Sequence, residues 1–72
     1  MSGLIKRSFS LAGHRTSIAL EPEFWDTLAA MATADGQTLS AFVATTDSAR
    51  DPDRPLASAL RVLALLDAKK IA

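Results

Sequence analysis

The sequence predicts a small, mainly α-helical domain that begins with one short β-strand and continues with three helices. In 14–20 the apolar residues Ile18 and Leu20 lie two positions apart, as in a strand with one apolar face, and apolar residues recur at helical spacing from there on. Turn-forming residues interrupt the helical pattern near position 36 and again in 50–55. With 72 residues, we expect one domain with four parts: an N-terminal arm (1–13), a strand-helix-helix core (14–49), a loop (50–55) and a C-terminal helix (56–72).

The predicted strand has two different faces. Ile18 and Leu20 lie two positions apart and share one face, whereas Arg15, Ser17 and Ala19 share the other. No second strand follows later in the chain, so the backbone groups along this strand would lack partners. We therefore expect it to pair with the same strand of a second copy, as an antiparallel ribbon between two subunits.

The arm before this strand contains an alternation of its own, with Phe9 and Leu11 as its apolar residues. These positions are odd-numbered, whereas the apolar positions of the strand are even-numbered. A bulge or bend at Gly13 would allow the odd-numbered apolar residues before it and the even-numbered ones after it to face the same side. The arm either adds a second short strand or covers the edge of the ribbon, and the sequence leaves both open.

Start and stop signals define the three helices. Pro22 suits the first turn of the first helix, and Gly36 suits a left-handed cap at its end. Thr38 is a good N-cap for the second helix, and the two prolines in 50–55 separate that helix from the third. The residues expected in the core or in a dimer interface are Ile18, Leu20, Trp25, Leu28, Phe42, Val43, Leu60 and Leu63.

Composition excludes several classes of function. There is no cysteine, and His14 is the sole histidine, so we expect no disulfide and no metal site. We see no catalytic residues and no cofactor motif, and we expect a protein that is not an enzyme. No apolar run is long enough to span a membrane, and no secretory signal is evident, so we expect a cytoplasmic protein. For so small a chain, oligomerisation is the remaining route to stability.

The net charge is zero, but the charges are unevenly distributed. The first 20 residues contain Lys6, Arg7 and Arg15 and no acidic residue, whereas 21–53 contain acidic residues against Arg50 alone. The positive charge therefore lies on and before the predicted strand. This asymmetry favours an anionic partner such as DNA for that part of the chain.

The order of strand, helix, glycine turn and helix resembles the ribbon-helix-helix family of bacterial DNA-binding proteins. Residues 16–20 look like the ribbon of that family, 21–28 like the start of its first helix, and 36–43 like its turn and second helix. The resemblance covers about residues 14–49. The arm and the third helix depart from the minimal pattern and look like a bacterial subgroup in which the strand begins as Gly13–Ser17.

The resemblance implies a DNA-binding role for the outer face of the ribbon. By position, Arg15, Ser17 and Ala19 would contact base edges. Arg15 could donate two hydrogen bonds to a guanine, Ser17 could donate or accept, and Ala19 offers only a methyl contact. By the same resemblance, phosphates would be bound by Thr38, Leu39 and Ser40 at the start of the second helix, with Lys6, Arg7 and His14 adding contacts.

We therefore expect a homodimeric transcriptional regulator, a repressor, that inserts a two-stranded ribbon into the major groove of double-stranded DNA. The alternative is a protein-protein interaction module, or an antitoxin, on the same fold with weak or no specific DNA binding. Ala19 on the outer face and the wide apolar surface of the third helix favour that alternative. An antitoxin would need a free C-terminal segment, which the helical pattern of 56–72 argues against.

Overall fold

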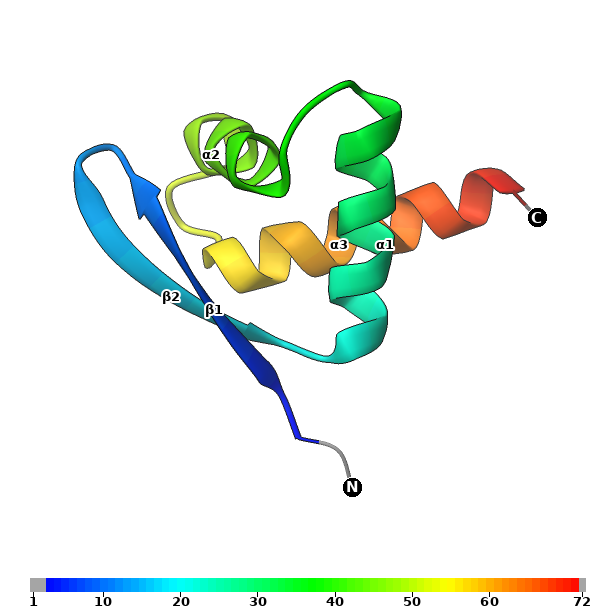
Figure 1. The fold of residues 1–72 in the computed structure, drawn as a ribbon, viewed down its shortest axis with the longest axis horizontal. Helices are drawn as coiled ribbons and strands as arrows, with labels where there is room; N and C mark the ends of the chain where they lie inside the picture. The colour runs from blue at the N-terminus through cyan, green and yellow to red at the C-terminus, as the bar shows by residue number, and fades with distance from the viewer. Residues whose placement is uncertain (1–2, 72) are drawn as a thin grey trace.

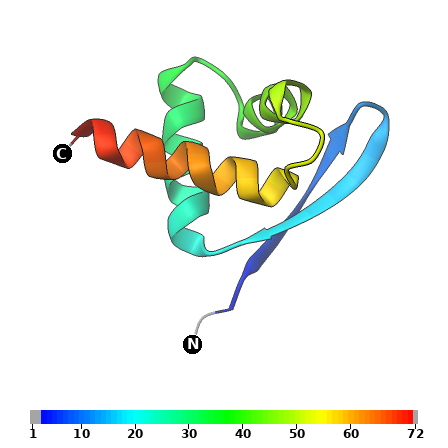
Figure 2. The same ribbon diagram turned by 180° about the vertical axis from the view of Figure 1, so that it is seen from behind.

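The computed structural model describes residues 3–71 of the chain. In this range the elements are β1 (Ile5–Leu11), β2 (His14–Leu20), α1 (Pro22–Ala34), α2 (Leu39–Ala49) and α3 (Leu56–Ile71). The two strands form a hairpin that lies along one side of the helices (Figure 1). Helix α3 crosses α1, and Figure 2 shows the molecule from behind, with α3 in front. No helix in residues 3–71 is long and apolar enough to cross a lipid bilayer.

The expectation of one short strand is wrong. The segment expected to be an arm contains β1, which pairs antiparallel with β2 along its whole length, from Ile5 opposite Leu20 to Leu11 opposite His14. Of the two alternatives for the arm, the second strand is therefore the one that forms. Pairing with β1 occupies one edge of β2 and leaves its other edge free, so the pairing of this strand with a second copy stays a prediction.

A two-residue turn joins the strands and explains why the apolar positions are odd-numbered in β1 and even-numbered in β2. Ala12 has a φ of 51° and Gly13 a φ of 82°, and positive φ at both central positions is the signature of a type I′ hairpin turn. Because two residues separate the strands, each odd-numbered residue of β1 lies opposite an even-numbered residue of β2. Gly13 is therefore part of a tight hairpin turn and not of a bulge.

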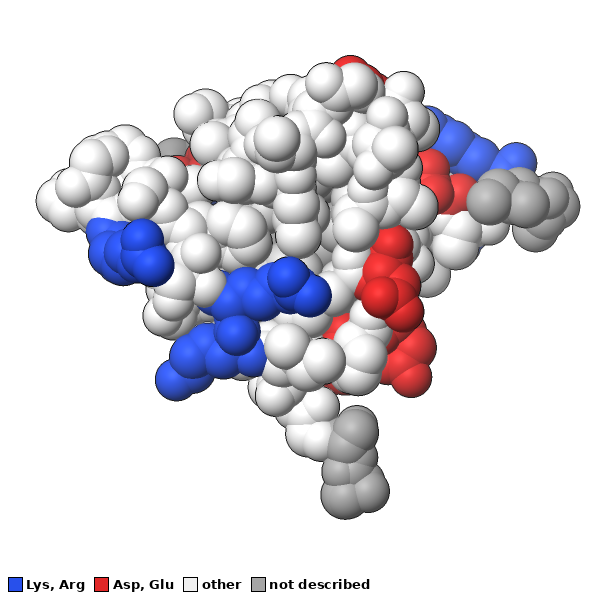
Figure 3. Space-filling view, in the orientation of Figure 1, with Lys and Arg blue, Asp and Glu red and all other residues white. Residues whose placement is uncertain are grey.

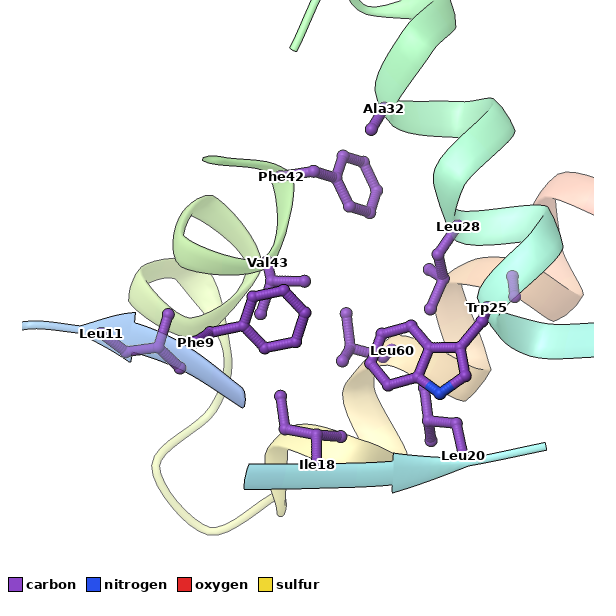
Figure 4. Close-up of a cluster of buried hydrophobic side chains, with 11 residues drawn as sticks. Phe9, Leu11, Ile18, Leu20, Trp25, Leu28, Ala32, Phe42, Val43 and Leu60 are labelled. Atoms are coloured by element: carbon purple, nitrogen blue, oxygen red, sulfur yellow. The ribbon is translucent and has the colours of Figure 1, made fainter. Parts of the chain in front are cut away.

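The core lies between the hairpin and the three helices that residues 3–71 form (Figure 4). The inner face of the hairpin contributes Phe9, Leu11, Ile18 and Leu20. Figure 4 shows these side chains pointing toward residues from all three helices. The helical members of the cluster are Trp25, Leu28, Ala32, Phe42, Val43, Leu60 and Ala64. Of the eight residues expected in the core or interface, Leu63 alone is not buried within the protomer, although it packs against the cluster.

Trp25 connects α1 to the start of β1. Its side chain is 2% exposed, and its ring lies 5.8 Å from the ring of Phe9, centroid to centroid. The indole Nε1 donates a hydrogen bond of 2.8 Å to the carbonyl oxygen of Ile5. A buried tryptophan needs such an acceptor for its N–H group. The hydrogen bond holds the first residue of the hairpin against the helical layer.

Local signals fix the helix ends much as the sequence predicts. Pro22 is the first residue of α1, and Gly36 follows its end with a φ of 69°. Thr38 caps α2, its hydroxyl oxygen accepting a 3.0 Å hydrogen bond from the backbone N–H of Ala41. The predictions of a Pro-initiated first helix and a Thr-capped second helix are confirmed.

An ion pair connects the junction of β2 and α1 to α3. Arg61 donates hydrogen bonds from Nε and Nη2 to Oε1 of Glu21, at 3.1 and 3.0 Å. A hydrogen bond with its own backbone lowers the pKa of Glu21 most, and the hydrogen bond from Arg61 lowers this pKa further. Both side chains are more than a third exposed, so the pair positions α3 more than it stabilises the fold.

Candidate nucleic-acid interface

The hairpin presents one polar face that is turned away from the helices. Residues opposite each other in an antiparallel pair point to the same side of the sheet, and successive residues alternate. Because Phe9, Leu11, Ile18 and Leu20 face the core, the intervening positions face outward. This outer face consists of three cross-strand pairs: Lys6 with Ala19, Ser8 with Ser17, and Ser10 with Arg15.

The outer face is exposed, hydroxyl-rich and positively charged. Ala19 is partly buried, whereas the other five residues of the face are exposed. The hydroxyls of Ser8 and Ser17 lie 3.1 Å apart and form a hydrogen bond across the strands. In residues 3–71 the ion pairs are Arg50–Asp47 and Arg61–Glu21, so no protein carboxylate neutralises the cations of the outer face.

On the face of the molecule drawn in Figure 3, the charges of the hairpin differ from those of α1. Figure 3 shows Lys and Arg side chains gathered over the hairpin, whereas Asp and Glu gather over α1 on the same side of the molecule. The cations of the hairpin are Lys6, Arg7 and Arg15, all exposed. An anionic polymer would therefore meet an attractive surface at the hairpin and a repulsive one at α1.

The structure places the predicted base-contacting residues together. Arg15, Ser17 and Ala19 occupy alternate positions of β2 on the outer face. Lys6, predicted as a phosphate contact, lies on this face as well, opposite Ala19. The sequence analysis missed Ser8 and Ser10, which share the face. Their alternation with Phe9 and the short Ala-Gly turn were the signals that could have found them.

Arg7 and His14, two other predicted phosphate contacts, belong to the opposite face of the hairpin. Arg7 lies opposite Ile18, and its guanidinium carbon is 5.5 Å from the centre of the Trp25 ring. This is a cation–π distance, so Arg7 covers the exposed rim of the core. His14 lies opposite Leu11, next to the turn, and is exposed.

The start of α2 holds the remaining predicted phosphate contacts. The hydroxyl of Thr38 is already engaged as the cap of the helix. Leu39 packs against the core cluster, whereas Ser40 is exposed. Thr38 therefore has a structural role that does not depend on any ligand.

Among residues 3–71, no group of three or more His, Cys, Asp or Glu side chains could hold a metal ion. The acidic residues over α1 are therefore not gathered into a metal centre.

Comparison with known families agrees with this arrangement. The family model described as "Ribbon-helix-helix domain" matches residues 4–68. The chain belongs to the ribbon-helix-helix domain family. The match extends well beyond residues 14–49, which carry the resemblance seen in the sequence, and includes β1 and most of α3.

One solved structure is similar over nearly the whole chain. It is that of an uncharacterized protein from Bordetella pertussis Tohama I, with a TM-score of 0.74 and 28% sequence identity. The similarity covers 96% of this chain and 62% of the Bordetella protein, so the chain spans less than two thirds of the length of that protein. No curated protein matches the chain. The family suggests a DNA-binding regulator, and the neighbour adds support for the fold.

Proposed function

We propose that this ribbon-helix-helix protein is a homodimeric transcriptional repressor of the bacterial cytoplasm that inserts its hairpin into the major groove of DNA. The observation that carries the proposal is the outer face of the hairpin. It combines the cations of Lys6 and Arg15 with the hydroxyls of Ser8, Ser10 and Ser17, and it contains no acidic residue. A two-stranded β-ribbon is one of the two elements that the major groove admits.

Contacts to bases would come from the β2 residues of the outer face. Arg15 can donate two hydrogen bonds to the O6 and N7 atoms of a guanine, worth about 1–3 kcal/mol of discrimination. Ser17 shares a hydrogen bond with Ser8, so the two hydroxyls would contact a base edge as a pair. Ala19 offers a methyl group for a thymine. Arg15 would therefore dominate the specificity.

Contacts to phosphates would provide affinity without sequence preference. Lys6 lies at the open end of the outer face and extends the contact surface away from the turn. The backbone N–H groups of Leu39 and Ser40, at the positive end of the α2 dipole, would bind a flanking phosphate. Arg7 and His14 lie on the other face and would contact the DNA only from the side of the hairpin.

The experiment that tests this function begins with selection of bound duplexes from a random pool by the wild-type protein. Binding of the selected duplex is then measured by fluorescence anisotropy across a salt series. We expect affinity to fall with salt in proportion to the phosphates contacted. A scrambled duplex should bind more weakly than the selected one, because the base contacts are lost.

Two variants make the test specific to the outer face. The Arg15→Ala/Ser17→Ala variant should bind the selected and scrambled duplexes equally weakly. The control is Arg54→Ala, which removes an exposed cation from the loop between α2 and α3 and should leave discrimination unchanged. Selection without enrichment, or discrimination that survives in the Arg15→Ala/Ser17→Ala variant, would rule out the hairpin as the specific DNA contact.

A second candidate function, a protein-interaction module on the same fold, is favoured by one observation. Val62, Leu65 and Leu66 leave an apolar surface of α3 exposed. An antitoxin would be a special case of such a module. However, α3 packs on the protomer through Leu60 and Ala64, which does not suit a segment that folds only on binding a toxin. Equal, weak DNA binding by wild type and variant would place this second function first.

A further inference from the structure

A groove lies where α1, α2 and α3 meet (Figures 1 and 2). Its volume is about 530 Å³, within the range of about 300–1,000 Å³ that small-molecule sites occupy. Among the residues that the structure describes, those that line the groove all belong to 31–63, and the hairpin is not part of it. Its apolar walls include Met31, Phe42, Ala59, Val62 and Leu63. A molecule bound in the groove would therefore leave the outer face of the hairpin free.

Hydrogen bonds within the chain hold the walls of the groove in place. Arg50, at the end of α2, donates from Nε to Oδ1 of Asp47 at 2.9 Å and from Nη1 to the carbonyl oxygen of Arg54 at 2.8 Å. The hydroxyls of Thr45 and Thr46 donate to backbone carbonyls of their own helix, each at 3.0 Å. These hydroxyl protons are therefore used within the protein, and the groove is formed without a ligand.

One end of the groove carries a negative charge without a partner. Asp35 lines the groove and is the C-cap of α1, where the helix dipole is negative. The last turn of α1 contains no basic residue, whereas α2 has Arg50 at its C-cap. The ion pairs in residues 3–71 are Arg50–Asp47 and Arg61–Glu21, so Asp35 is paired with no cation there. A cation bound at this end would relieve the repulsion between the carboxylate and the helix dipole.

The other charges of the groove do not offset that of Asp35. The charge of Arg50 is already matched by its ion pair. Asp51 and Arg54 have opposite signs and belong to one turn, in which the N–H of Arg54 donates to the carbonyl oxygen of Asp51 at 2.9 Å. Gln37 lines the groove two residues after Asp35 and offers an amide oxygen. The groove thus combines apolar walls with one anionic end that is rich in hydrogen-bond acceptors.

We propose that this groove binds a small organic cation, an amine whose apolar body lies against Phe42 and Val62 and whose ammonium group binds the carboxylate of Asp35. A neutral apolar molecule would leave the charge of Asp35 unmatched, and an anionic one would be repelled by it. The site goes beyond the proposed contact with DNA and does not depend on it.

The test uses three probes that share one carbon skeleton, phenylbutylamine, phenylbutanol and phenylbutyrate, at neutral pH. Each is titrated into isotope-labelled protein while the backbone amide signals are followed by NMR. We expect the amine to shift the signals of residues that line the groove, with a dissociation constant in the millimolar range or below. The alcohol should bind about two- to fivefold more weakly and the carboxylate about three- to thirtyfold more weakly, because an exposed ion pair contributes modestly.

Two pairs of variants assign the binding to the groove. Asp35→Asn should remove the advantage of the amine over the alcohol, whereas Asp26→Asn, an exposed position of α1 outside the groove, should keep it. Val62→Asn takes away part of the apolar wall and should weaken all three probes. Its control is Leu65→Asn, which changes an exposed residue of α3 that does not line the groove. Circular dichroism confirms that each variant is folded.

Three results would overturn the inference. The first is equal or tighter binding of the carboxylate by the wild type, and the second is an advantage of the amine that survives in Asp35→Asn. The third is the lack of any saturable shift at the groove up to about 10 mM amine. Discrimination between DNA duplexes is measured without these probes, so the proposed DNA contact stands or falls separately.

Discussion

Replacing Trp25 with phenylalanine is the sharpest test of how the hairpin is held on the helices. The change keeps an aromatic ring beside Phe9 but removes the N–H group that donates to the carbonyl of Ile5 at 2.8 Å. It also removes part of a side chain that is almost fully buried. The loss should therefore combine a broken, partly buried hydrogen bond with a small cavity.

The magnitude follows from these two losses. Losing a partly buried hydrogen bond of this kind costs about 0.5–1.5 kcal/mol. The smaller ring forfeits about 1–2 kcal/mol of apolar burial and packing. Together they lower the free energy of unfolding by roughly 1.5–3.5 kcal/mol, out of roughly 4–11 kcal/mol for a domain of this size. The melting temperature should fall by roughly 6–28 °C, with the protein still folded at low temperature.

Thermal denaturation by circular dichroism measures the total effect, and amide exchange locates it. Exchange should accelerate more near the Ile5–Leu20 pair than near the Leu11–His14 pair, because the lost hydrogen bond lies at the open end of the hairpin. Phe42→Leu is the control, since it removes buried ring area from α2 without touching that hydrogen bond. Equal acceleration at both ends of the hairpin in Trp25→Phe would refute the argument.

Three further predictions concern the turn, the ion pair and the two faces of β1. Ala12→Asn should raise the free energy of unfolding by about 0.5–1 kcal/mol in chemical denaturation, because Asn-Gly suits positive φ better than Ala-Gly; a loss would contradict the turn assignment. Arg61→Ala should raise the pKa of Glu21 only part of the way, because the backbone hydrogen bond is the larger cause. Since folding lowers this pKa, Glu21 stabilises the protein above its unfolded pKa and loses that effect as the pH falls through its folded pKa. In Arg61→Ala, NMR titration should show a higher pKa for Glu21, and acid denaturation should show a stability that depends less on pH. An unchanged Glu21 pKa would exclude a role for Arg61. Lys6→Ala should reduce the slope of log affinity for DNA against log salt by about 0.9, whereas Arg7→Ala should reduce this slope by less and lower stability by about 0.5–1 kcal/mol; the reverse result would assign the two faces of β1 the other way.

Most of the fold was predictable because local signals agree with the tertiary structure. Pro22, Gly36 and Thr38 mark helix ends through properties of their own backbone and side chains, which do not depend on distant contacts. The two-residue spacing of Ile18 and Leu20 placed Arg15 and Ser17 on the other face of the strand, and the structure keeps them there. Periodicity of this kind survives folding because burial of the other face enforces it.

The prediction failed where a turn carries a weak signal. Alanine is uncommon at a position with positive φ, so Ala12-Gly13 lacks the Asn-Gly or Asp-Gly sequence that announces a type I′ turn. The change from odd-numbered apolar positions at Phe9 to even-numbered ones at Ile18 was visible in the sequence, but a bulge and a hairpin both account for it. Only the pairing of β1 with β2 distinguishes the two, and that pairing also brings Ser8 and Ser10 to the candidate site.

The covalent connection between β1 and β2 changes what dilution can do to the ribbon. When two strands come from separate chains, they separate at concentrations below the dissociation constant of the dimer. Here the turn of Ala12 and Gly13 keeps the strands at a high effective concentration, whatever the amount of protein. The surface proposed to contact bases therefore exists in every folded chain, and its assembly is a step of folding. Regulation by protein level would then act on how many half-sites are filled together, and not on whether the contact surface forms.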